Sequence, residues 1–557
     1  MGLRLAAAAA LAAALLLPAP ALARTPKDPF TRAAERVAKV VDDARQNAAI
    51  PADAAASYRA ELTSTVKVLG ALDTPAKATR RDELGSQLLQ MAAVADRGAL
   101  TPERLPAFFR QLEANRAWFA AKAPPAALAR VQVPGDPLVY GYYPDHGLQL
   151  QPLFNWTKAN QYWFAHDYAG LQAMVDALAP LAVPQPGGWV AWEYLWDYGS
   201  GKAPWKSGMA EGVALQVLAR AWQATGSTAD LDLAHRVLPG FGVPTSSGGL
   251  VDASTPGWWP LYAFDPAHRV LNGDLQVVIS LYDYASITGD TTALGWAQQG
   301  AQAALTALPA FDTGSWSMYD QSHEADLGYH DLMTTQLGQL AAKSGITDFR
   351  LAALRFASYR ATPPVITAEA QALPAPFFPD PADGFLDTGA VTGTLSKVSS
   401  ITMTVLNGDG AVVAAESLGR RPRGPLTITW NGRVGGRPAA PGDYTLAATA
   451  VDLAGNRADP VAVGQVRIVR DVTPPQVVRV RVGRSEGQLR LRWAVRDATT
   501  PWVNLTVQVD GRGRRLFHLP QAGVRVVDVR APRRAFRASV KVADSSGNAV
   551  TVDRRPG

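Results

Sequence analysis

Two short segments of the chain concentrate side chains that could transfer protons. The first, Phe311–Asp320, reads Phe-Asp-Thr-Gly-Ser-Trp-Ser-Met-Tyr-Asp, and the second, Leu327–Leu332, reads Leu-Gly-Tyr-His-Asp-Leu. A free tyrosine has a pKa of about 10, so it is a good proton donor and becomes a useful base only where its anion is stabilised. Acid–base chemistry is therefore the first class of reaction to consider.

Composition and spacing exclude several other kinds of site. The 557 residues include no cysteine, which excludes a thiol nucleophile, a disulfide scaffold, a zinc-thiolate site and an iron–sulfur site. The seven histidines are scattered without a metal-binding spacing, and the sequence has neither a Gly-x-Ser-x-Gly elbow nor a Walker loop. We expect no metal and no cofactor, while calcium on the acidic loops stays an open alternative.

The elements that must position these segments are helices joined by aromatic loops. Residues 131–364 are dense in Trp and Tyr, and helical stretches such as Gly212–Thr225, Leu271–Thr288 and Trp296–Leu308 end near Gly or Pro. Repetition of helix, aromatic loop and helix predicts an (α/α)-toroid, whose loops build a cleft at one mouth. Aromatic rings stack on the apolar faces of pyranoses, so such a cleft suits sugars.

The start of the chain predicts export. Residues 1–23 have the pattern of a signal peptide, with Arg4, the apolar run Leu5–Leu17 and the cleavage site Ala21-Leu-Ala23. That run is too short to span a bilayer. Residues 24–130 are helix-like and predict a small helical region packed on the toroid. We expect a secreted, extracellular bacterial protein, with association with the cell surface as an alternative.

The last third of the chain is expected to form β-structure. Residues 365–380 are a Pro/Ala-rich linker, and later runs such as Ile401–Val405 alternate with period two. Asp452-Leu-Ala-Gly-Asn456 recurs as Asp544-Ser-Ser-Gly-Asn548, 92 residues later. The repeat predicts two Ig-like β-sandwiches, 381–470 and 471–557. The expected fold class is therefore a multidomain α + β chain, with a mainly α-helical (α/α)-toroid before the two sandwiches.

Two families resemble parts of this chain. The first sandwich resembles the Ig-like domain of flagellar hook-capping proteins in Trp430-Asn-Gly432 and Pro441-Gly-Asp-Tyr444, which implies fold only. Residues 135–360 resemble the C-terminal catalytic domain of D-glucuronyl C5-epimerases, which invert C5 of glucuronate in heparan-type polysaccharides. The ordered pieces that carry this resemblance, besides the two opening segments, are Tyr142-Tyr-Pro144, Gly187-Gly-Trp189, Trp205-Lys-Ser-Gly-Met-Ala-Glu-Gly212, Val270-Leu-Asn-Gly273 and Leu281-Tyr-Asp283.

The second resemblance implies roles for individual residues. Epimerisation removes a proton next to a carboxylate and returns one from the opposite face, so it needs two acid–base groups, each worth about 10²–10⁴-fold in rate. By motif match Tyr319, Tyr329 and Tyr262 are the implied catalytic tyrosines, with Tyr319 and Tyr329 as the acid–base pair and Tyr262 as an assistant. The residues implied in substrate binding are Tyr143, Asn272, His330 and Trp316.

Two departures from the family leave other reactions open. Animal members have a Glu where this chain has Leu261, and an Arg three residues after the tyrosine matched by Tyr319, where this chain has Ser322. Asp265 or Glu324 could replace the Glu. A polysaccharide lyase or a glycoside hydrolase on the toroid, and a non-catalytic cell-wall glycan-binding protein, are the alternatives.

Charge is distributed unevenly and suggests a second task. Residues 365–557 carry a net charge of +10 and residues 1–364 a net charge of −4. The expected partner is a polysaccharide substrate, with an acidic polysaccharide as an alternative, and the basic modules are expected either to act as a plain spacer or to contact a cell-wall polymer. The whole-chain charge of +6 is too small to predict nucleic acid as a partner.

Overall fold

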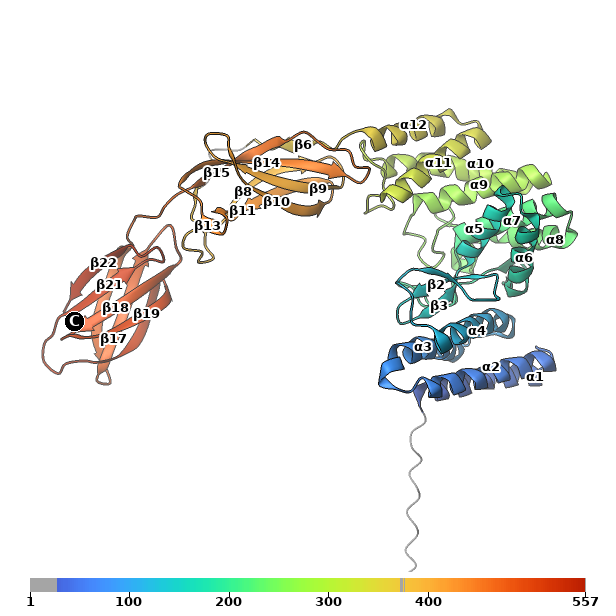
Figure 1. Cartoon of the computed structure of the whole chain (residues 1–557), viewed down its shortest axis with the longest axis horizontal. Helices are drawn as coiled ribbons and strands as arrows, with labels where there is room; N and C mark the ends of the chain where they lie inside the picture. Colours follow the sequence, from blue (N-terminus) through green and yellow to red (C-terminus); the bar gives the residue numbers. More distant parts are fainter. Residues whose placement is uncertain (1–27, 371–373, 375, 556–557) are drawn as a thin grey trace, which may run out of the picture. The chain divides into compact units, whose positions relative to one another are not determined.

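Helices come first in the chain and strands come last (Figure 1). The computed structural model describes residues 28–370, 374 and 376–555, so the predicted signal peptide lies outside the described residues. One compact unit runs to His268 and takes in Gln276–Gly300, and a second takes in Arg269–Leu275 and continues from Ala301. The predicted order of a mainly α-helical region followed by β-sandwiches is confirmed.

Four helices open the first unit: α1 (Pro29–Gln46), α2 (Ala52–Ala71), α3 (Ala78–Asp96) and α4 (Leu105–Ala121). Helix α1 begins where it does because the Asp28 carboxylate accepts hydrogen bonds from the amides of Phe30 and Thr31, at 3.2 and 3.3 Å. One face of each helix is buried. Val37 and Val41 of α1, for example, are fully excluded from solvent.

A small antiparallel sheet follows and is fastened to α3. Its strands are β1 (Arg130–Gln132), β2 (Val139–Tyr143) and β3 (Gly147–Leu150). The buried carboxylate of Glu83 in α3 accepts hydrogen bonds from the Tyr142 hydroxyl at 2.6 Å and the Gly147 amide at 2.8 Å. Because a buried carboxylate is tolerated only when it is bonded in this way, Glu83 fixes the turn that follows Tyr143.

The next helices come in consecutive pairs, the repeating unit expected of an (α/α)-toroid. The first unit holds α5 (Pro152–Phe164), α6 (Tyr168–Leu178), α7 (Gly208–Thr225) and α8 (Thr228–Val237), with the short strands β4 (Val183–Pro184) and β5 (Val190–Ala191). Helices α9 (Leu271–Thr288) and α10 (Thr291–Ala307) contribute to both units, and α11 (Leu327–Ser344) and α12 (Thr347–Ala361) belong to the second. Gly226 and Gly345 end α7 and α11 with φ of 76° and 72°, a conformation that favours glycine.

The first sandwich is built from ten strands. Its sheets have the orders β10-β9-β14-β15-β7 and β11-β8-β6, with β12 and β13 as a separate pair. Their bounds are β6 (Ile366–Ala368), β7 (Pro376–Phe377), β8 (Gly389–Leu395), β9 (Ser399–Leu406), β10 (Val412–Arg421), β11 (Gly424–Trp430), β12 (Arg433–Val434), β13 (Arg437–Pro438), β14 (Gly442–Asp452) and β15 (Val461–Ile468). Strands β6 and β7 lie inside the stretch predicted as a linker, so part of that stretch is folded into the sandwich.

The second sandwich has the sheets β16-β17-β20 and β19-β18-β21-β22. The strands are β16 (Gln476–Ser485), β17 (Gln488–Arg496), β18 (Trp502–Val509), β19 (Arg512–Pro520), β20 (Ala522–Arg530), β21 (Ala538–Ala543) and β22 (Ala549–Arg554). The predicted repeat has one geometry in both copies. The backbone amides of Asn456 and Asn548 each donate to the carboxylate of the aspartate four residues earlier at 2.8 Å. The side-chain amides of the two asparagines donate to the same carboxylates at 3.0 Å.

No helix in the described part of the chain combines the length and apolarity needed to cross a membrane. The same described residues contain no group of three or more His, Asp or Glu side chains arranged to hold a metal ion.

Candidate active site

The loop before α11 holds Tyr319 through its backbone. The Met318 amide donates to the carbonyl of Phe311 at 2.9 Å, and the Tyr319 amide donates to that of His323 at 2.8 Å. The loop therefore folds back on itself on both sides of the tyrosine. Helix α11 is then capped by Asp326, whose carboxylate accepts from the Tyr329 amide at 2.8 Å and places this second tyrosine in the first helical turn.

This arrangement brings the two predicted catalytic tyrosines into contact. The ring centroids of Tyr319 and Tyr329 lie 4.7 Å apart, with the ring planes tilted by 52°. Tyr319 is half-buried, and 39% of Tyr329 is exposed. Two phenols therefore stand together at the solvent boundary of the second unit.

His330 and Trp316, close to this pair in sequence, are inside the core. Their rings stack with centroids 3.8 Å apart and an interplanar angle of 9°, and both side chains are buried. The Trp316 indole donates to the Ala325 carbonyl at 2.8 Å. The sequence predicted that both bind substrate. Their contacts favour a different role, which is to support the loop and helix that carry the tyrosines.

The hydrogen bonds of His330 define its tautomer. The carbonyl of Phe356, 3.0 Å from Nε2, can only accept, so Nε2 carries the hydrogen. Nδ1 then accepts from the Ser317 hydroxyl at 2.7 Å. Burial lowers the pKa of His330, although the bond to Phe356 opposes this shift. The ring is therefore held neutral in the folded protein.

A neutral buried histidine predicts a loss of stability in mild acid. The unfolded chain takes up a proton near the ordinary histidine pKa of about 6.5, whereas the folded chain resists it. Stability should be fully present above pH 7 and should fall as the pH is lowered toward 5. Thermal unfolding followed by tryptophan fluorescence checks this expectation. His330→Gln should flatten the pH dependence, and His323→Gln, at an exposed ring, should leave it unchanged. Equal slopes in all three proteins would contradict the assignment.

Asn272 lies in the first turn of α9 and is almost completely buried. Its carbonyl oxygen accepts a hydrogen bond from Gln336 of α11 at 3.0 Å. Its side-chain Oδ1 has no hydrogen-bond partner among the described residues. The role in substrate binding implied by the motif match remains a prediction.

In the first unit, Tyr143 and Tyr262 pack against one aromatic cluster, which we define as Tyr194, Trp196 and Trp205. Tyr194 and Trp205 stack with centroids 4.1 Å apart, and Tyr143 contacts Trp196 at 4.9 Å. Tyr262 lies 6.0 Å from the Trp205 ring. Tyr143 and Tyr262 are both half-buried, so each presents part of its ring to solvent. The structure thus places both predicted residues against one buried aromatic cluster, whose own rings are only 2–6% exposed and are not available to stack on a sugar.

Beside this cluster lies a buried charged group that the sequence did not single out. The Arg104 guanidinium binds both oxygens of buried Glu193, at 2.6 and 2.9 Å, and Gln185 bridges Glu193 to the Lys206 ammonium with two bonds of 3.0 Å. Burial raises the pKa of Glu211 well above its ordinary value and lowers the pKa of Lys206. Shifted carboxyl and amine groups mark functional sites as well as structural networks. Glu211 stands inside the quoted Trp205–Gly212 motif, which is the signal that could have identified it.

Glu324, one candidate replacement for the missing family Glu, interacts with the first sandwich instead. Its carboxylate accepts from the Val398 amide at 2.9 Å and pairs with Arg423 at 3.6 Å, and both partners belong to the first sandwich. Burial raises the pKa of Glu324, an effect that these partners oppose. Its contacts therefore favour a role in attaching the sandwich to the loop.

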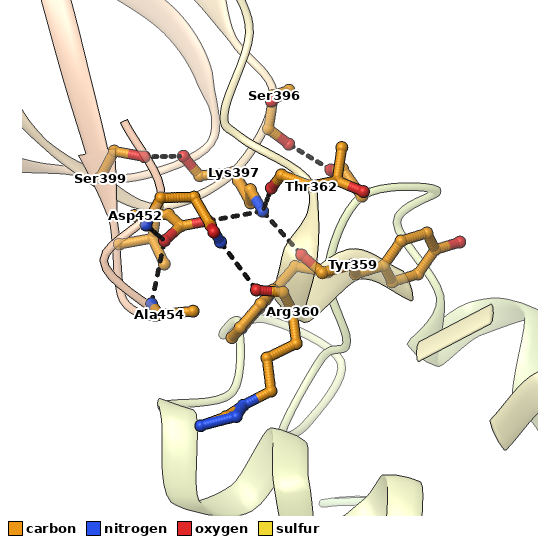
Figure 2. Close-up of polar contacts among 12 residues, drawn as sticks. Tyr359, Arg360, Thr362, Ser396, Lys397, Ser399, Asp452 and Ala454 are labelled. Carbon is orange, nitrogen blue, oxygen red and sulfur yellow. Dashed lines mark hydrogen bonds and ion pairs between the residues drawn. The ribbon is translucent and has the colours of Figure 1, made fainter. Parts of the chain in front are cut away.

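A second buried contact joins the first sandwich to α12 (Figure 2). Lys397 lies 2.7 Å from the Asp452 carboxylate, and each side chain is 1% exposed. The Lys397 ammonium also donates to the carbonyls of Tyr359, at 2.9 Å, and Thr362 at the end of α12. It lies 5.2 Å from the centre of the Trp316 ring. The buried Lys397 ammonium therefore contacts Asp452 of the sandwich, the end of α12 and the Trp316 ring.

Comparisons with known proteins give relatives for two parts of the chain. An uncharacterized protein of Methanocaldococcus jannaschii is 30% identical over 165 residues, which cover 28% of this chain and 53% of that protein. The D-glucuronyl C5-epimerase of Caenorhabditis elegans is 31% identical over 134 residues, 22% of each chain. The chain thus spans about half the length of the first relative and about a fifth of the second.

Solved structures give weaker likenesses. A GH76 α-mannanase of Bacteroides thetaiotaomicron has a TM-score of 0.28 and 13% identity, with 38% of this chain and 59% of that chain covered. A bacterial ice-binding adhesin has a TM-score of 0.19 and 15% identity, with 35% and 64% covered. Two family profiles match directly. Residues 187–358 match the D-glucuronyl C5-epimerase C-terminus and residues 383–453 match the FlgD Ig-like domain, so both predicted resemblances are confirmed.

Proposed function

We propose that the protein is a polysaccharide-modifying enzyme that inverts C5 of a hexuronate residue within a glycan. The observation that carries this proposal is the contact between Tyr319 and Tyr329 inside the segment that matches the epimerase family. The exposure of Tyr329, at 39%, supports it, because a substrate must be able to reach the acid–base groups.

The proposed reaction moves one proton off C5 and another onto it. A tyrosinate takes the C5 proton, the C5–H bond breaks, and its electron pair moves toward the neighbouring carboxylate. A second acid then donates a proton to the opposite face of C5, which inverts the centre while every other bond is kept. Each positioned acid–base group contributes about 10²–10⁴-fold in rate.

The contact between the Tyr319 and Tyr329 rings limits which proton-transfer steps each tyrosine can carry out. With centroids 4.7 Å apart the two rings touch, so a pyranose does not fit between them. We propose that Tyr319 and Tyr329 act as one unit at one face of C5. The motif match keeps Tyr262 as an assisting residue, and Tyr262→Phe tests that role directly.

Product analysis tests the proposed function. The protein is incubated with a glucuronan or a heparosan-like polymer, and the product is examined by NMR for glucuronate and iduronate signals. The proposal expects a new epimer with an unchanged chain length. Ultraviolet absorbance from an unsaturated product would mean a lyase, and new reducing ends without that absorbance would mean a glycoside hydrolase. Either result would replace the proposal.

We also propose that the chain is exported, on the basis of the signal-peptide pattern in residues 1–23. N-terminal sequencing of the protein recovered from a bacterial culture should give Arg24 as the first residue. A chain that retains Met1 or Gly2 would contradict this proposal.

A further inference from the structure

The net positive charge of residues 365–557 lies in the second sandwich. Residues 471–557 contain 17 Lys and Arg but only 7 Asp and Glu, whereas residues 365–470 contain nine of each class. The two sandwiches share the same turn geometry at their repeated Asp…Gly-Asn motifs, so the common fold does not require this difference. The charge therefore points to a property of the second sandwich alone.

Five of these 17 basic residues line one groove. A cavity of about 350 Å³ is bordered by β16, β17 and the end of β22, and its lining residues are Val480, Arg481, Val482, Gly483, Arg490, Arg492, Arg554 and Arg555. Among these described lining residues none is acidic. Four of the five arginines are exposed, so their guanidinium groups are accessible to a ligand.

The strand register places two of these charges against each other. Arg481 of β16 lies directly opposite Arg492 of β17. Like charges at directly opposite positions destabilise a sheet. Arg554, at the end of β22, is positioned by backbone carbonyls, because its Nε donates to Val480 at 3.0 Å and its Nη1 donates to Asp553 at 2.9 Å. An anion in the groove would relieve this repulsion.

An apolar strip continues the same face of the sheet. Val524 and Val526 of β20 lie opposite Arg492 and Arg490. They are 47% and 46% exposed, so their side chains are accessible to a ligand. A row of cations beside a row of exposed methyl groups matches a chain that carries carboxylates on apolar sugar rings. No aromatic ring lines the groove among the described residues, so it lacks the stacking platform that single-stranded nucleic acids use.

We propose that this groove, with Arg481, Arg490 and Arg492 at its centre, binds a carboxylated polysaccharide. The arginines would hold successive carboxylates by charge-assisted hydrogen bonds, and the valines would contact the sugar faces. The site lies outside the epimerase-like segment and goes beyond the proposed function, because it retains a polymer without reacting with it.

Retention of the full chain on immobilised glucuronan tests this site. Arg492→Gln and the pair Arg481→Gln with Arg490→Gln should each bind about tenfold or more weakly, since hydrogen bonds to charged groups are lost. The matched control is Arg514→Gln, an exposed arginine on β19, which lies at the opposite edge of its sheet from β22 and should bind as the unmodified chain does. Retention should also fall as salt is raised, and dextran should not be retained.

A stability measurement separates a binding role from a folding role. Arg492→Gln removes a cross-strand repulsion, so its Tm should equal or exceed that of the unmodified chain while its retention falls. A lower Tm together with lower retention would overturn the assignment, because the arginine would then be structural.

Three further results would overturn the proposal. They are no retention on glucuronan at low salt, equal weakening by Arg514→Gln, and tighter binding to single-stranded DNA or polyphosphate than to glucuronan. The outcome is independent of catalysis. C5 inversion without groove binding would reject only the groove, and groove binding without C5 inversion would reject only the proposed function.

Discussion

Replacing Tyr319 with phenylalanine is expected to lower the rate of C5 inversion by about 10²–10⁴-fold, the range for one lost acid–base group. The substitution removes only the hydroxyl. The backbone hydrogen bonds that hold the residue do not depend on this hydroxyl. One example is the bond that the Tyr319 amide donates to the His323 carbonyl at 2.8 Å. The ring contact with Tyr329 is also retained, so the unfolding temperature should stay close to that of the unmodified protein.

The matched control is Tyr168→Phe. Tyr168 and Tyr329 are equally exposed, at 39%, but Tyr168 stands on α6, and its hydroxyl contacts only His166 at 3.0 Å among the described residues. The control should keep full activity. Tyr329→Phe should resemble Tyr319→Phe if the two tyrosines act as one unit. Full activity in Tyr319→Phe would remove this residue from the mechanism.

The second large effect is expected at the buried ion pair of the first sandwich. Asp452→Asn would leave the Lys397 ammonium buried without its counter-charge, and breaking a buried pair in this way lowers stability by about 3–5 kcal/mol. Burial opposes ionisation of Asp452, but the pair with Lys397 and the bonds from Asn456 outweigh it and lower the pKa of Asp452. The carboxylate is therefore charged in the folded protein, and its loss is a loss of charge.

Urea unfolding measures this effect, and the chain offers a control in the same sandwich. Asp443 pairs with Arg467 at 2.6 Å, but the two side chains are about half exposed, so solvent screens the pair. Asp443→Asn should leave the unfolding midpoint unchanged. Adding Lys397→Met to Asp452→Asn should restore part of the lost stability, because it removes the stranded charge. An Asp452→Asn variant as stable as the unmodified chain would contradict the role assigned to this contact.

The same substitution is expected to affect the tyrosine loop. Lys397 lies 5.2 Å from the centre of the Trp316 ring, and Trp316 stacks on His330, the residue after Tyr329. The buried lysine of the first sandwich therefore contacts the aromatic pair that neighbours the candidate tyrosines in sequence.

Features that depend only on residues close together in the sequence were predicted well. The helix Leu271–Thr288 has the predicted bounds, and the Asp…Gly-Asn repeat forms the same turn in both sandwiches. Tyr319 and Tyr329 were predicted as an acid–base pair because both belong to short ordered motifs of one family, but the contact between their rings was not predicted.

Features that depend on residues distant in the sequence were not predicted. Strands β6 and β7 have three and two residues, too few for an alternating pattern, and they form only by pairing with β8 and β15. Sequence cannot distinguish a histidine stacked on tryptophan in a core from one that faces a substrate, so His330 and Trp316 were assigned to binding. The groove of the second sandwich depends on strand register, which brings Arg481 and Arg492 together from separate strands.

Proton exchange at C5 tests the central claim most directly. The protein is incubated with a glucuronan in D₂O, and deuterium at C5 is read by NMR beside the glucuronate and iduronate signals. The proposed mechanism predicts deuterium at C5 together with the new epimer, and a large loss of both in Tyr319→Phe. No deuterium at C5 on several uronans, with folded protein, would contradict proton abstraction at this site and with it the proposed function.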